Sequence, residues 1–300
     1  MLDAHGEIVL CSVTMKLSNN KKRKIMPIYA RPHSVETSTD SYLKVYSSAD
    51  EAKKRLFNLG AGVWSHPFWT NVDLPPQTKA FAAIQSPCIH HDFVAEAKLP
   101  FASNSVDCFY TSHVVEHLPQ KVVERLMHEV FRCLRKGGCF RIVTGPDADT
   151  DWEALLRGDE KWWFGLDEPK LVAALVRDRA PMTIYDKWLY EVATARSPYS
   201  DTPCEKKYTS AEVKKLVIRY KNNPDALRDM LDKGLAFSYK FPGDHVSWWN
   251  ASKLKKFLKK AGFKTAFRSG YGQSVSPFMR DMRYFDQTFP QMSVYVEGVK

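Results

Sequence analysis

Short apolar segments alternate with helical patterns between residues 51 and 147. The segments RLFNLG, NVDL, CIHHDF, VDCFYTS and GCFRIVTG are bounded by polar or turn residues, which is typical of β-strands. Before the last of them, residues Lys121–Lys136 carry apolar side chains at helical spacing and end on RKGG, a pattern that predicts a helix and its end. Strands that alternate with helices in this way predict a parallel, doubly wound α/β sheet.

The remaining residues fall into three stretches of different character. Residues 1–50 mix polar runs with short apolar segments, which predicts an N-terminal arm. Residues 148–246 hold helical patterns rich in tryptophan and charge, such as DWEALLRGDEKWWF, LVAALVRDRA and SAEVKKLVIRYKNN, and predict a mainly helical insertion that caps the substrate. Residues 247–300 return to the earlier pattern and complete the core of residues 51–147. An insertion of this kind predicts a pocket where the two bodies meet.

A helix expected at SKLKKFLKK accounts for part of the positive charge. Apolar residues at helical spacing form its buried stripe: Leu254, Phe257, Leu258 and Ala261. The five lysines of the segment are then expected on the solvated face. A formal net charge of +10 would also suit a nucleic acid, but solvated helix faces explain much of it. Nucleic acid is therefore disfavoured as a partner without being excluded.

Composition limits the class of protein. The 300 residues are 44% hydrophobic and 26% charged, which is typical of a globular protein with a sizeable core. The six cysteines show neither CxxC nor CxxH spacing, so neither a zinc site nor a disulfide framework is expected, and a reducing, cytoplasmic location is predicted. No apolar run reaches the length of a membrane span. The sequence does not indicate an oligomeric state.

The segment NLGAGVWSHPFWTNVD joins two of the expected strands through a glycine turn. Asn58 stands near the end of the first strand, Gly60 and Gly62 follow it, and Asp73 ends the next strand. Glycines at such a turn let the backbone approach a nucleoside-bearing ligand, and the carboxylate can accept hydrogen bonds from two ribose hydroxyls. A plain tight turn explains the glycines equally well, so this segment alone does not decide between the two.

Further motifs follow in order along the chain. HHDF is followed by LPFASNSVDCFYTSHVVEHLP and VFRCLRKGGCFRIVTGPD, and the chain closes with HVSWWNASKLKKFLKKAGF and SVYVEGVK. Together with NLGAG, this series resembles the class I S-adenosylmethionine-dependent methyltransferases. The resemblance implies a mostly parallel, seven-stranded Rossmann-like sheet whose last strand is antiparallel. It also implies methyltransferase activity with S-adenosylmethionine as the cofactor.

The resemblance assigns cofactor contacts to individual positions. It implies that Asp73 binds the ribose, that Asp92 accepts a hydrogen bond from the adenine amino group and that Phe93 covers the adenine ring. It sets four residues against the methionine portion of the cofactor: Asn58, Gly60, Ala61 and Gly62. From the residue alone, Asp92 could equally cap a nearby backbone amide.

Two departures from the family pattern concern the glycine turn. Asn58 stands where many members carry an acid, so it can hydrogen-bond the cofactor's ammonium group without neutralising it. Trp64 stands at the third glycine position, and only about ten residues separate Gly62 from Asp73. Since a parallel crossover normally needs about a dozen residues or more, the first helix is expected to be shortened or missing.

Candidate catalytic residues follow the fourth and fifth strands. Methyl transfer from a sulfonium needs alignment, and it also needs a base where the acceptor is a hydroxyl group. His113 and His117 follow the fourth strand, Asp147 follows the fifth, and His245 ends the insertion. Imidazole titrates in the useful pH range, so the histidines suit this role. His117 could equally pack against or cap the start of a helix.

The acceptor is inferred from the fourth strand and from the insertion. Enzymes that methylate exocyclic base nitrogens usually carry Asn or Asp followed by Pro-Pro and an aromatic residue at this strand, where this chain has FYTSHVVEH. The tryptophans of the insertion could stack on sugar rings, although a core role is the stronger interpretation. We therefore expect O-methylation of a small molecule or of a sugar of a surface glycan.

Other functions stay open on this sequence. Asp147 and Asp149 in PDADTD have the D-x-D spacing of metal-dependent glycosyltransferases, although acids after a strand more often cap the next helix. No metal site is therefore predicted. The positive charge leaves an RNA methyltransferase as an alternative. Asn58 and Trp64 leave a binding protein that has lost catalysis as another.

Overall fold

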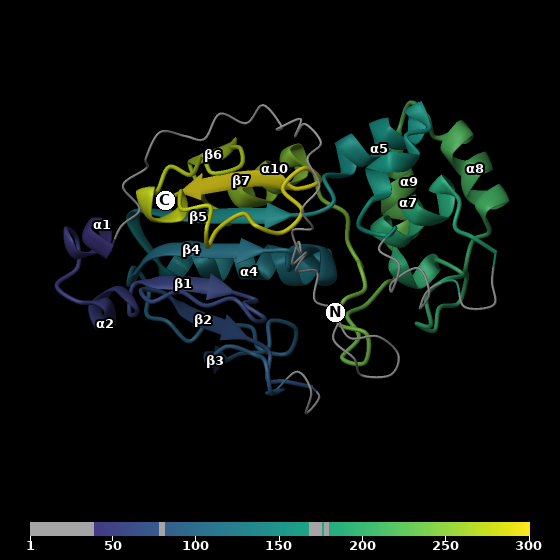
Figure 1. The fold of residues 1–300 in the computed structure, drawn as a ribbon. Helices are drawn as coiled ribbons and strands as arrows, with labels where there is room; N and C mark the ends of the chain where they lie inside the picture. The colour runs from purple at the N-terminus through teal and green to yellow at the C-terminus, as the bar shows by residue number, and fades with distance from the viewer. Residues whose placement is uncertain (1–38, 78–81, 168–175, 177–179) are drawn as a thin grey trace, which may run out of the picture.

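The computed structural model describes residues 39–77, 82–167, 176 and 180–300 (Figure 1). Most of the predicted N-terminal arm and most of the segment LVAALVRDRA therefore lie outside the described residues. The division of the chain into four stretches stays a prediction. Within the described part, no helix is long and apolar enough to cross a membrane. The compartment stays a prediction as well.

One seven-stranded sheet forms the centre of the fold, in the order β3-β2-β1-β4-β5-β7-β6. β1 to β5 are parallel to one another, and β7 runs antiparallel to both β5 and β6. This confirms the predicted mostly parallel sheet with an antiparallel last strand. The strands are β1 (Leu56–Leu59), β2 (Thr70–Asp73), β3 (Cys88–His90), β4 (Val106–Ser112), β5 (Leu134–Thr144), β6 (Thr265–Arg268) and β7 (Val294–Val299).

Helices pack on one face of the sheet, and a further group of helices lies between β5 and α10 along the chain. The α-helices are α1 (Thr39–Leu43), α2 (Ala49–Ala52), α4 (Gln120–Cys133), α5 (Ala148–Arg157), α7 (Ile184–Val192), α8 (Ser210–Arg219), α9 (Pro224–Asp232) and α10 (Ala251–Ala261). The 3₁₀ turns are η1 (Val115–His117), η2 (Glu160–Trp163), η3 (Thr194–Arg196) and η4 (Pro277–Met279).

α4 and α10 cover one face of the sheet. The predicted apolar stripe of α4 is buried, and α10 packs beside α4 and against β7. The expected end of this helix at Lys136 is wrong, because α4 ends at Cys133. Leu134 takes an extended backbone conformation and pairs with Val106 as the first residue of β5. The basic and glycine residues of RKGG therefore belong to a strand, not to a helix end.

Aromatic side chains cover the opposite face where a helix between β1 and β2 would lie. Residues 60–69 form turns only, so the predicted loss of the first helix is confirmed. We call the rings on this face the aromatic layer: Tyr42, Trp64, His66, Phe68, Trp69 and Phe285. Tyr42 stacks on Phe68 with a centroid distance of 4.4 Å. Large rings fill the space of a crossover helix, which lets so short a loop join parallel strands.

The helical body lies beyond the carboxyl ends of the parallel strands (Figure 1). We use this name for the described part of residues 148–246, which holds α5, α7, α8 and α9. Its core contains Trp152, Trp163 and Trp188, and Trp248 from the following segment packs with them. Trp249 belongs to the core of the sheet. The stronger interpretation of these tryptophans, as core residues, is confirmed.

One lysine of α10 departs from the predicted solvated face. The ammonium group of Lys253 lies 3.6 Å from the ring centroid of Trp248 and donates to the carbonyl oxygen of Trp248 at 3.0 Å. Burial lowers the pKa of Lys253 to about 8. Lys256, Lys259 and Lys260 are exposed as expected. A lysine at the first turn of a helix can thus cover an aromatic ring with its cation.

Candidate active site

The turn after β1 brings three backbone segments together at the carboxyl edge of the sheet. Gly60 (φ +73°) donates from its N–H to the carbonyl oxygen of Val72 at 2.7 Å, and Gly62 (φ +55°) donates to Oδ2 of Asp73 at 2.6 Å. A Cβ added at Gly60 would lie 2.3 Å from Cγ2 of Val114, whereas one at Gly62 would meet nothing within 4 Å. Gly60 therefore permits close packing against the segment after β4, and Gly62 leaves open space beside Asp73.

Asp73 holds its carboxylate at the end of β2. Its oxygens accept hydrogen bonds from the N–H of Gly62 at 2.6 Å and from the N–H of Leu74 at 2.7 Å. Burial raises the pKa of Asp73 against the effect of these bonds. Each carboxylate oxygen still has a lone pair that could accept from a ribose hydroxyl. The structure brings the turn and the acid together, and the ribose contact stays a prediction.

Asn58 supplies a test of whether this edge fits the cofactor. Its side chain is 3% exposed, and its Oδ1 atom is buried without a hydrogen-bond partner among the described residues. A buried acceptor left without a donor costs about 1–3 kcal/mol. The ammonium group of S-adenosylmethionine would provide such a donor, so the residue fits the cofactor. Ala61, 7% exposed, lies between the two glycines of the turn.

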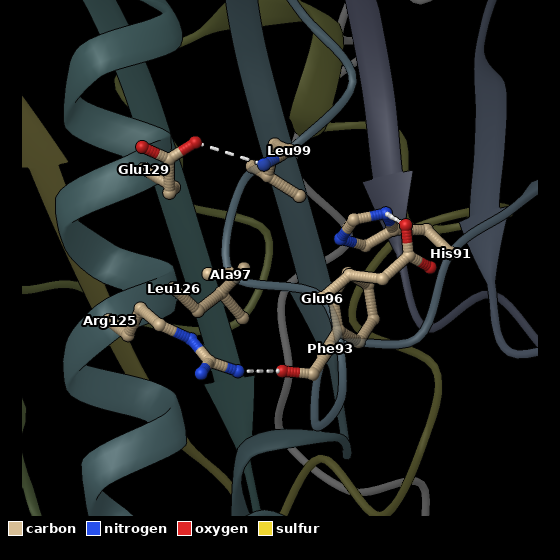
Figure 2. A pocket seen from close by; sticks show the side chains of 8 residues that line it. All are labelled: His91, Phe93, Glu96, Ala97, Leu99, Arg125, Leu126 and Glu129. Atoms are coloured by element: carbon tan, nitrogen blue, oxygen red, sulfur yellow. Dashed lines mark hydrogen bonds and ion pairs between the residues drawn. The ribbon is translucent and has the colours of Figure 1, made fainter.

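The loop after β3 is held in place by α4. Figure 2 shows Arg125 donating to the carbonyl oxygen of Phe93 at 2.6 Å and Glu129 accepting from the N–H of Leu99 at 2.9 Å. The side chains around these contacts enclose a cavity of about 10 Å³, which has room for about one water molecule. This cavity is too small for a nucleoside. The hydrogen bonds from Arg125 and to Glu129 instead fix the loop that carries Asp92.

Asp92 and Phe93 have protein partners of their own. Oδ1 of Asp92 accepts from the N–H of Val94 at 2.8 Å, and Oδ2 accepts from the hydroxyl of Tyr239 at 2.7 Å. Partial burial acts to raise the pKa of Asp92, but these hydrogen bonds lower it overall. Phe93 is 8% exposed and packs into the core of the sheet. The adenine contacts of both residues stay predictions.

Five titratable side chains gather where β4 ends, and we call them the β4 histidine cluster: His113, Glu116, His117, Glu191 and His245. Three of them come from the segment that leaves β4 and forms η1. Glu191 belongs to α7 of the helical body, and His245 precedes α10. The structure thus brings together the predicted His113, His117 and His245. Their catalytic role stays a prediction.

Glu116 is the buried carboxylate of the cluster. It is 3% exposed, its Oε2 accepts from the hydroxyl of Thr144 at 2.7 Å, and its Oε1 lies 3.2 Å from Nδ1 of His113. Burial alone would raise its pKa, but the hydrogen bond and charge of His113 lower the pKa of Glu116 to about 2. The carboxylate is therefore ionised at neutral pH. Sequence reasoning passed over Glu116, although its place beside His117 in EHL was a usable signal.

Both ring nitrogens of His113 are engaged by the protein. Nε2 lies 3.0 Å from the carbonyl oxygen of Thr288 and 2.9 Å from the hydroxyl of Ser293, and Nδ1 faces Glu116. A carbonyl oxygen only accepts, so Nε2 of His113 carries a proton. His113 has positive φ (+54°), which turns its side chain toward this partner set. His113 consequently orients Glu116 and has no free nitrogen for a substrate.

His117 and His245 each use one nitrogen only. Nδ1 of His117 donates to the carbonyl oxygen of Asp244 at 3.1 Å, and Nδ1 of His245 donates to the carbonyl oxygen of Glu191 at 2.5 Å. Because Nδ1 carries the proton, Nε2 carries the lone pair in the neutral form of both rings. Burial lowers the pKa of His245 to about 4, so this ring is neutral at pH 7.

Besides Glu116, sequence reasoning missed Glu191, which neighbours His245, and Tyr239, which neighbours Asp92. Burial raises the pKa of Glu191 to about 7, and its Oε2 lies 3.5 Å from Nδ1 of His245. Glu191 stands within an ordinary helical pattern, and Tyr239 reaches Asp92 across 147 residues of sequence. Neither contact leaves a local signal in the chain.

Asp147 and the acids after it serve the helical body. Asp147 caps α5 by accepting from the N–H of Asp149 at 3.3 Å, and it pairs with Arg268 at 3.0 Å. Asp151 is buried and accepts from the indole N–H of Trp162 at 2.6 Å. These contacts are those of helix-capping and structural carboxylates, in agreement with the alternative given for PDADTD. A base role for Asp147 stays a prediction.

Comparison with known proteins adds to this geometry. Residues 62–142 match the family described as “Methyltransferase domain”. A search of curated proteins found no match. Among solved structures, the chain is similar to the S-adenosylmethionine-dependent methyltransferase SibL in its apo form, with 13% identity and a TM-score of 0.36. That alignment covers 89% of this chain and 53% of SibL, so the chain spans about half of the length of SibL.

Two further solved structures cover more of their own chains. A methyltransferase from Mesorhizobium loti, described as S-adenosylmethionine dependent, is 16% identical with a TM-score of 0.37, over 82% of this chain and 90% of that one. A SAM-dependent methyltransferase from Archaeoglobus fulgidus is 12% identical with a TM-score of 0.37, over 89% of this chain and 95% of that one.

The family match begins at Gly62, the second glycine of the turn, and spans β2, β3, β4 and most of β5. The mostly parallel seven-stranded sheet with its antiparallel β7 agrees with the fold expected of a class I methyltransferase. Residues 62–142 thus match a methyltransferase domain, which supports S-adenosylmethionine-dependent methyl transfer by this chain.

Proposed function

We propose that this methyltransferase methylates an oxygen atom, in a hydroxyl group of a small molecule or of a single sugar unit of a glycan. The supporting observation is the β4 histidine cluster, in which two imidazoles direct Nδ1 to backbone carbonyl oxygens and keep Nε2 without a hydrogen bond among the described residues, beside the carboxylate of Glu116. A hydroxyl group must lose its proton as it accepts a methyl group. A site rich in groups that bind or remove a proton therefore suits a hydroxyl acceptor.

The cluster and the cofactor turn are close neighbours in the fold. Val114, at the start of η1, packs so tightly on Gly60 that a Cβ there would lie 2.3 Å from its side chain. When bound, S-adenosylmethionine supplies a methyl group whose carbon–sulfur bond breaks as the new carbon–oxygen bond forms. The chain's own residues align the acceptor at the end of β4. They also receive the hydroxyl proton or stabilise the negative charge that develops on the acceptor oxygen.

The helical body supports an acceptor of limited size. His245 is 9% exposed, and Thr194 of η3 holds it by donating from its N–H to the His245 carbonyl at 3.1 Å. The sheet edge and the helical body thus close around the cluster from two sides. A small molecule or one sugar ring can approach groups covered in this way more readily than a nucleic acid duplex can.

The test combines an acceptor screen with a matched pair of histidine variants. Purified protein and S-adenosylmethionine are incubated with hydroxyl, amine and thiol acceptors, and products are identified by mass spectrometry. For the best hydroxyl acceptor we expect His117→Gln to lower kcat by about 100-fold or more, as for loss of a group that handles the proton. His128→Gln, on the exposed side of α4, should keep the wild-type rate.

Affinity for S-adenosylhomocysteine is measured in parallel to show that both variants fold and bind cofactor. Methylation confined to nitrogen or sulfur acceptors would contradict the proposal. So would a His117→Gln variant that methylates the hydroxyl acceptor as fast as the wild type.

A further inference from the structure

Three side chains of the β4 histidine cluster are arranged like the ligands of one metal ion. Glu116, His117 and His245 each offer one ligand atom, and these atoms all lie within 4.8 Å of one another. The two imidazole rings are 4.9 Å apart between centroids and inclined by 57°. Zinc takes nitrogen and oxygen ligands at about 2.0–2.2 Å, so side-chain rotations would have to bring the three atoms into one coordination sphere. We propose that Glu116, His117 and His245 bind a divalent transition metal ion such as zinc.

The outer hydrogen bonds of both histidines are those that metal ligands need. Nδ1 of His117 donates to the carbonyl oxygen of Asp244, and Nδ1 of His245 donates to the carbonyl oxygen of Glu191. Histidines that bind a metal almost always give their second N–H to a carbonyl or carboxylate, which fixes the tautomer and the ring orientation. Among the described residues, no hydrogen bond reaches Nε2 of either ring. The two neighbouring rings therefore each keep an Nε2 lone pair that can bind the same metal ion.

The carboxylate ligand is equally fixed. Oε2 of Glu116 accepts from the hydroxyl of Thr144, and Oε1 lies 3.2 Å from Nδ1 of His113 and accepts from the N–H of Gly145 at 3.5 Å. Its backbone carbonyl oxygen accepts from the N–H of Val246 at 2.9 Å and from the N–H of Ser247 at 3.2 Å. These bonds join η1 to the segment that carries His245. The two ligand-bearing segments are thus held as one unit before any ion binds, which favours tight binding.

The donor set selects the class of ion. Two imidazole nitrogens and one carboxylate oxygen suit zinc and its first-row neighbours, whereas magnesium and calcium prefer sites made of oxygen. Three protein ligands leave at least one position for an exchangeable ligand, as in catalytic zinc sites. No cysteine belongs to this set of ligands. Residues 116, 117 and 245 are also too far apart in the sequence to form a familiar zinc-binding motif.

The role of the ion rests on the proposed function. An acceptor hydroxyl at the open position would have a lowered pKa, because a bound cation stabilises its anion. The hydroxyl proton would pass to solvent water, the oxygen would gain the methyl group, and the electron pair of the carbon–sulfur bond would stay on sulfur. His117 and His245 would then act as ligands, and neither would take the proton itself.

Metal binding is tested on the full chain after treatment with EDTA and dialysis. Calorimetric titration with zinc chloride should give one ion per chain, and cobalt(II) should give visible absorption without the charge-transfer band of a thiolate ligand. His117→Gln and His245→Gln should each weaken zinc binding by more than about tenfold, given that loss of an outer-shell partner alone costs about 10- to 100-fold. His128→Gln, exposed on α4, should bind zinc like the wild type.

Binding of S-adenosylhomocysteine and the unfolding midpoint show that each variant is folded. The metal site would be overturned if folded wild type binds no zinc or cobalt, if both glutamine variants bind zinc as tightly as the wild type, or if cobalt shows a thiolate band. Full hydroxyl methylation by EDTA-treated protein, with His117→Gln inactive, would also overturn the metal site while leaving O-methylation intact. Zinc binding in a protein that methylates only nitrogen or sulfur would support the site and contradict the proposed function.

Discussion

At the scale of single residues, His66 is a buried and hydrogen-bonded histidine within the aromatic layer. Its Nδ1 accepts from the N–H of Phe68 at 3.1 Å, and Nε2 lies 3.4 Å from the hydroxyl of Tyr42. Aromatic rings surround it, and burial lowers the pKa of His66 to about 4. Asp281 and Arg283 act on this pKa in opposite directions and are weaker than burial. His66 is therefore neutral in the folded protein at pH 7.

This neutral histidine predicts a loss of stability in acid. In the unfolded chain His66 binds a proton near pH 6.5, and in the folded chain it does so only near pH 4. Between these two pH values the unfolded state binds more protons than the folded state. The contribution of His66 to stability is therefore complete above about pH 6.5 and disappears as the pH falls to about 4. We expect this group to lower the free energy of unfolding by up to about 3 kcal/mol across that range.

Urea unfolding of wild type and His66→Gln at several pH values measures the contribution. The difference in free energy of unfolding between the two proteins should shrink as the pH falls from 6.5 to 4. His128→Gln, which alters an exposed histidine, should run parallel to the wild type. A curve for His66→Gln that is also parallel to the wild type would show that His66 is not the group responsible.

At the scale of elements, the packing of the β1 turn against η1 decides whether the cofactor edge can form. Gly60→Ala would force a Cβ onto Val114 in addition to the strain of a positive φ. Gly158→Ala is a matched control, because Gly158 has a similar φ of +68° with nothing within 4 Å of an added Cβ. The control should cost only about 1–2 kcal/mol of backbone strain.

We expect Gly60→Ala to lose more stability than Gly158→Ala and to bind S-adenosylhomocysteine much more weakly. Denaturant unfolding and calorimetry measure the two effects. Equal stability and equal cofactor affinity in the two variants would show that the close approach of β1 and η1 is not required.

The elements differ in how far the sequence predicts them. The strands and the missing first helix follow from local apolar patterns and from the short spacing between Gly62 and Asp73. The end of α4 was misjudged because Leu134 suits the helical stripe by its spacing but pairs with Val106 in the sheet. Tertiary pairing overrides local propensity at that point. Lys253 was misjudged for a similar reason, since only the fold brings Trp248 beneath its ammonium group.

Contacts between distant parts of the chain lie beyond such patterns. Arg141, in the centre of β5, is fully buried and pairs with Asp286 and Glu297, 145 and 156 residues away. The candidate site likewise has one part that local sequence predicts and one part that it does not. The cofactor motif follows from one continuous segment, whereas the partnership of Glu116 with His245 appears only when the helical body folds onto η1.

At the scale of the whole molecule, the sheet and the helical body meet at one site. The sheet contributes the glycine turn, Asp73 and the residues after β4, and the helical body contributes Glu191 and the residues that hold His245. The titratable groups thus gather where the carboxyl edge of the sheet and the helical body meet. The acceptor proposal and the proposed role of the metal ion both depend on cofactor binding at the sheet edge.

The first measurement is therefore a calorimetric titration of the wild-type chain and of Asp73→Ala with S-adenosylhomocysteine, with Asp50→Ala, exposed on α2, as a control. We expect one binding site per chain, wild-type affinity in Asp50→Ala, and an affinity about 10- to 100-fold weaker in Asp73→Ala, as for loss of hydrogen bonds to a charged group. Folded wild type that binds no S-adenosylhomocysteine, or an Asp73→Ala variant that binds it like the wild type, would contradict the cofactor site described here.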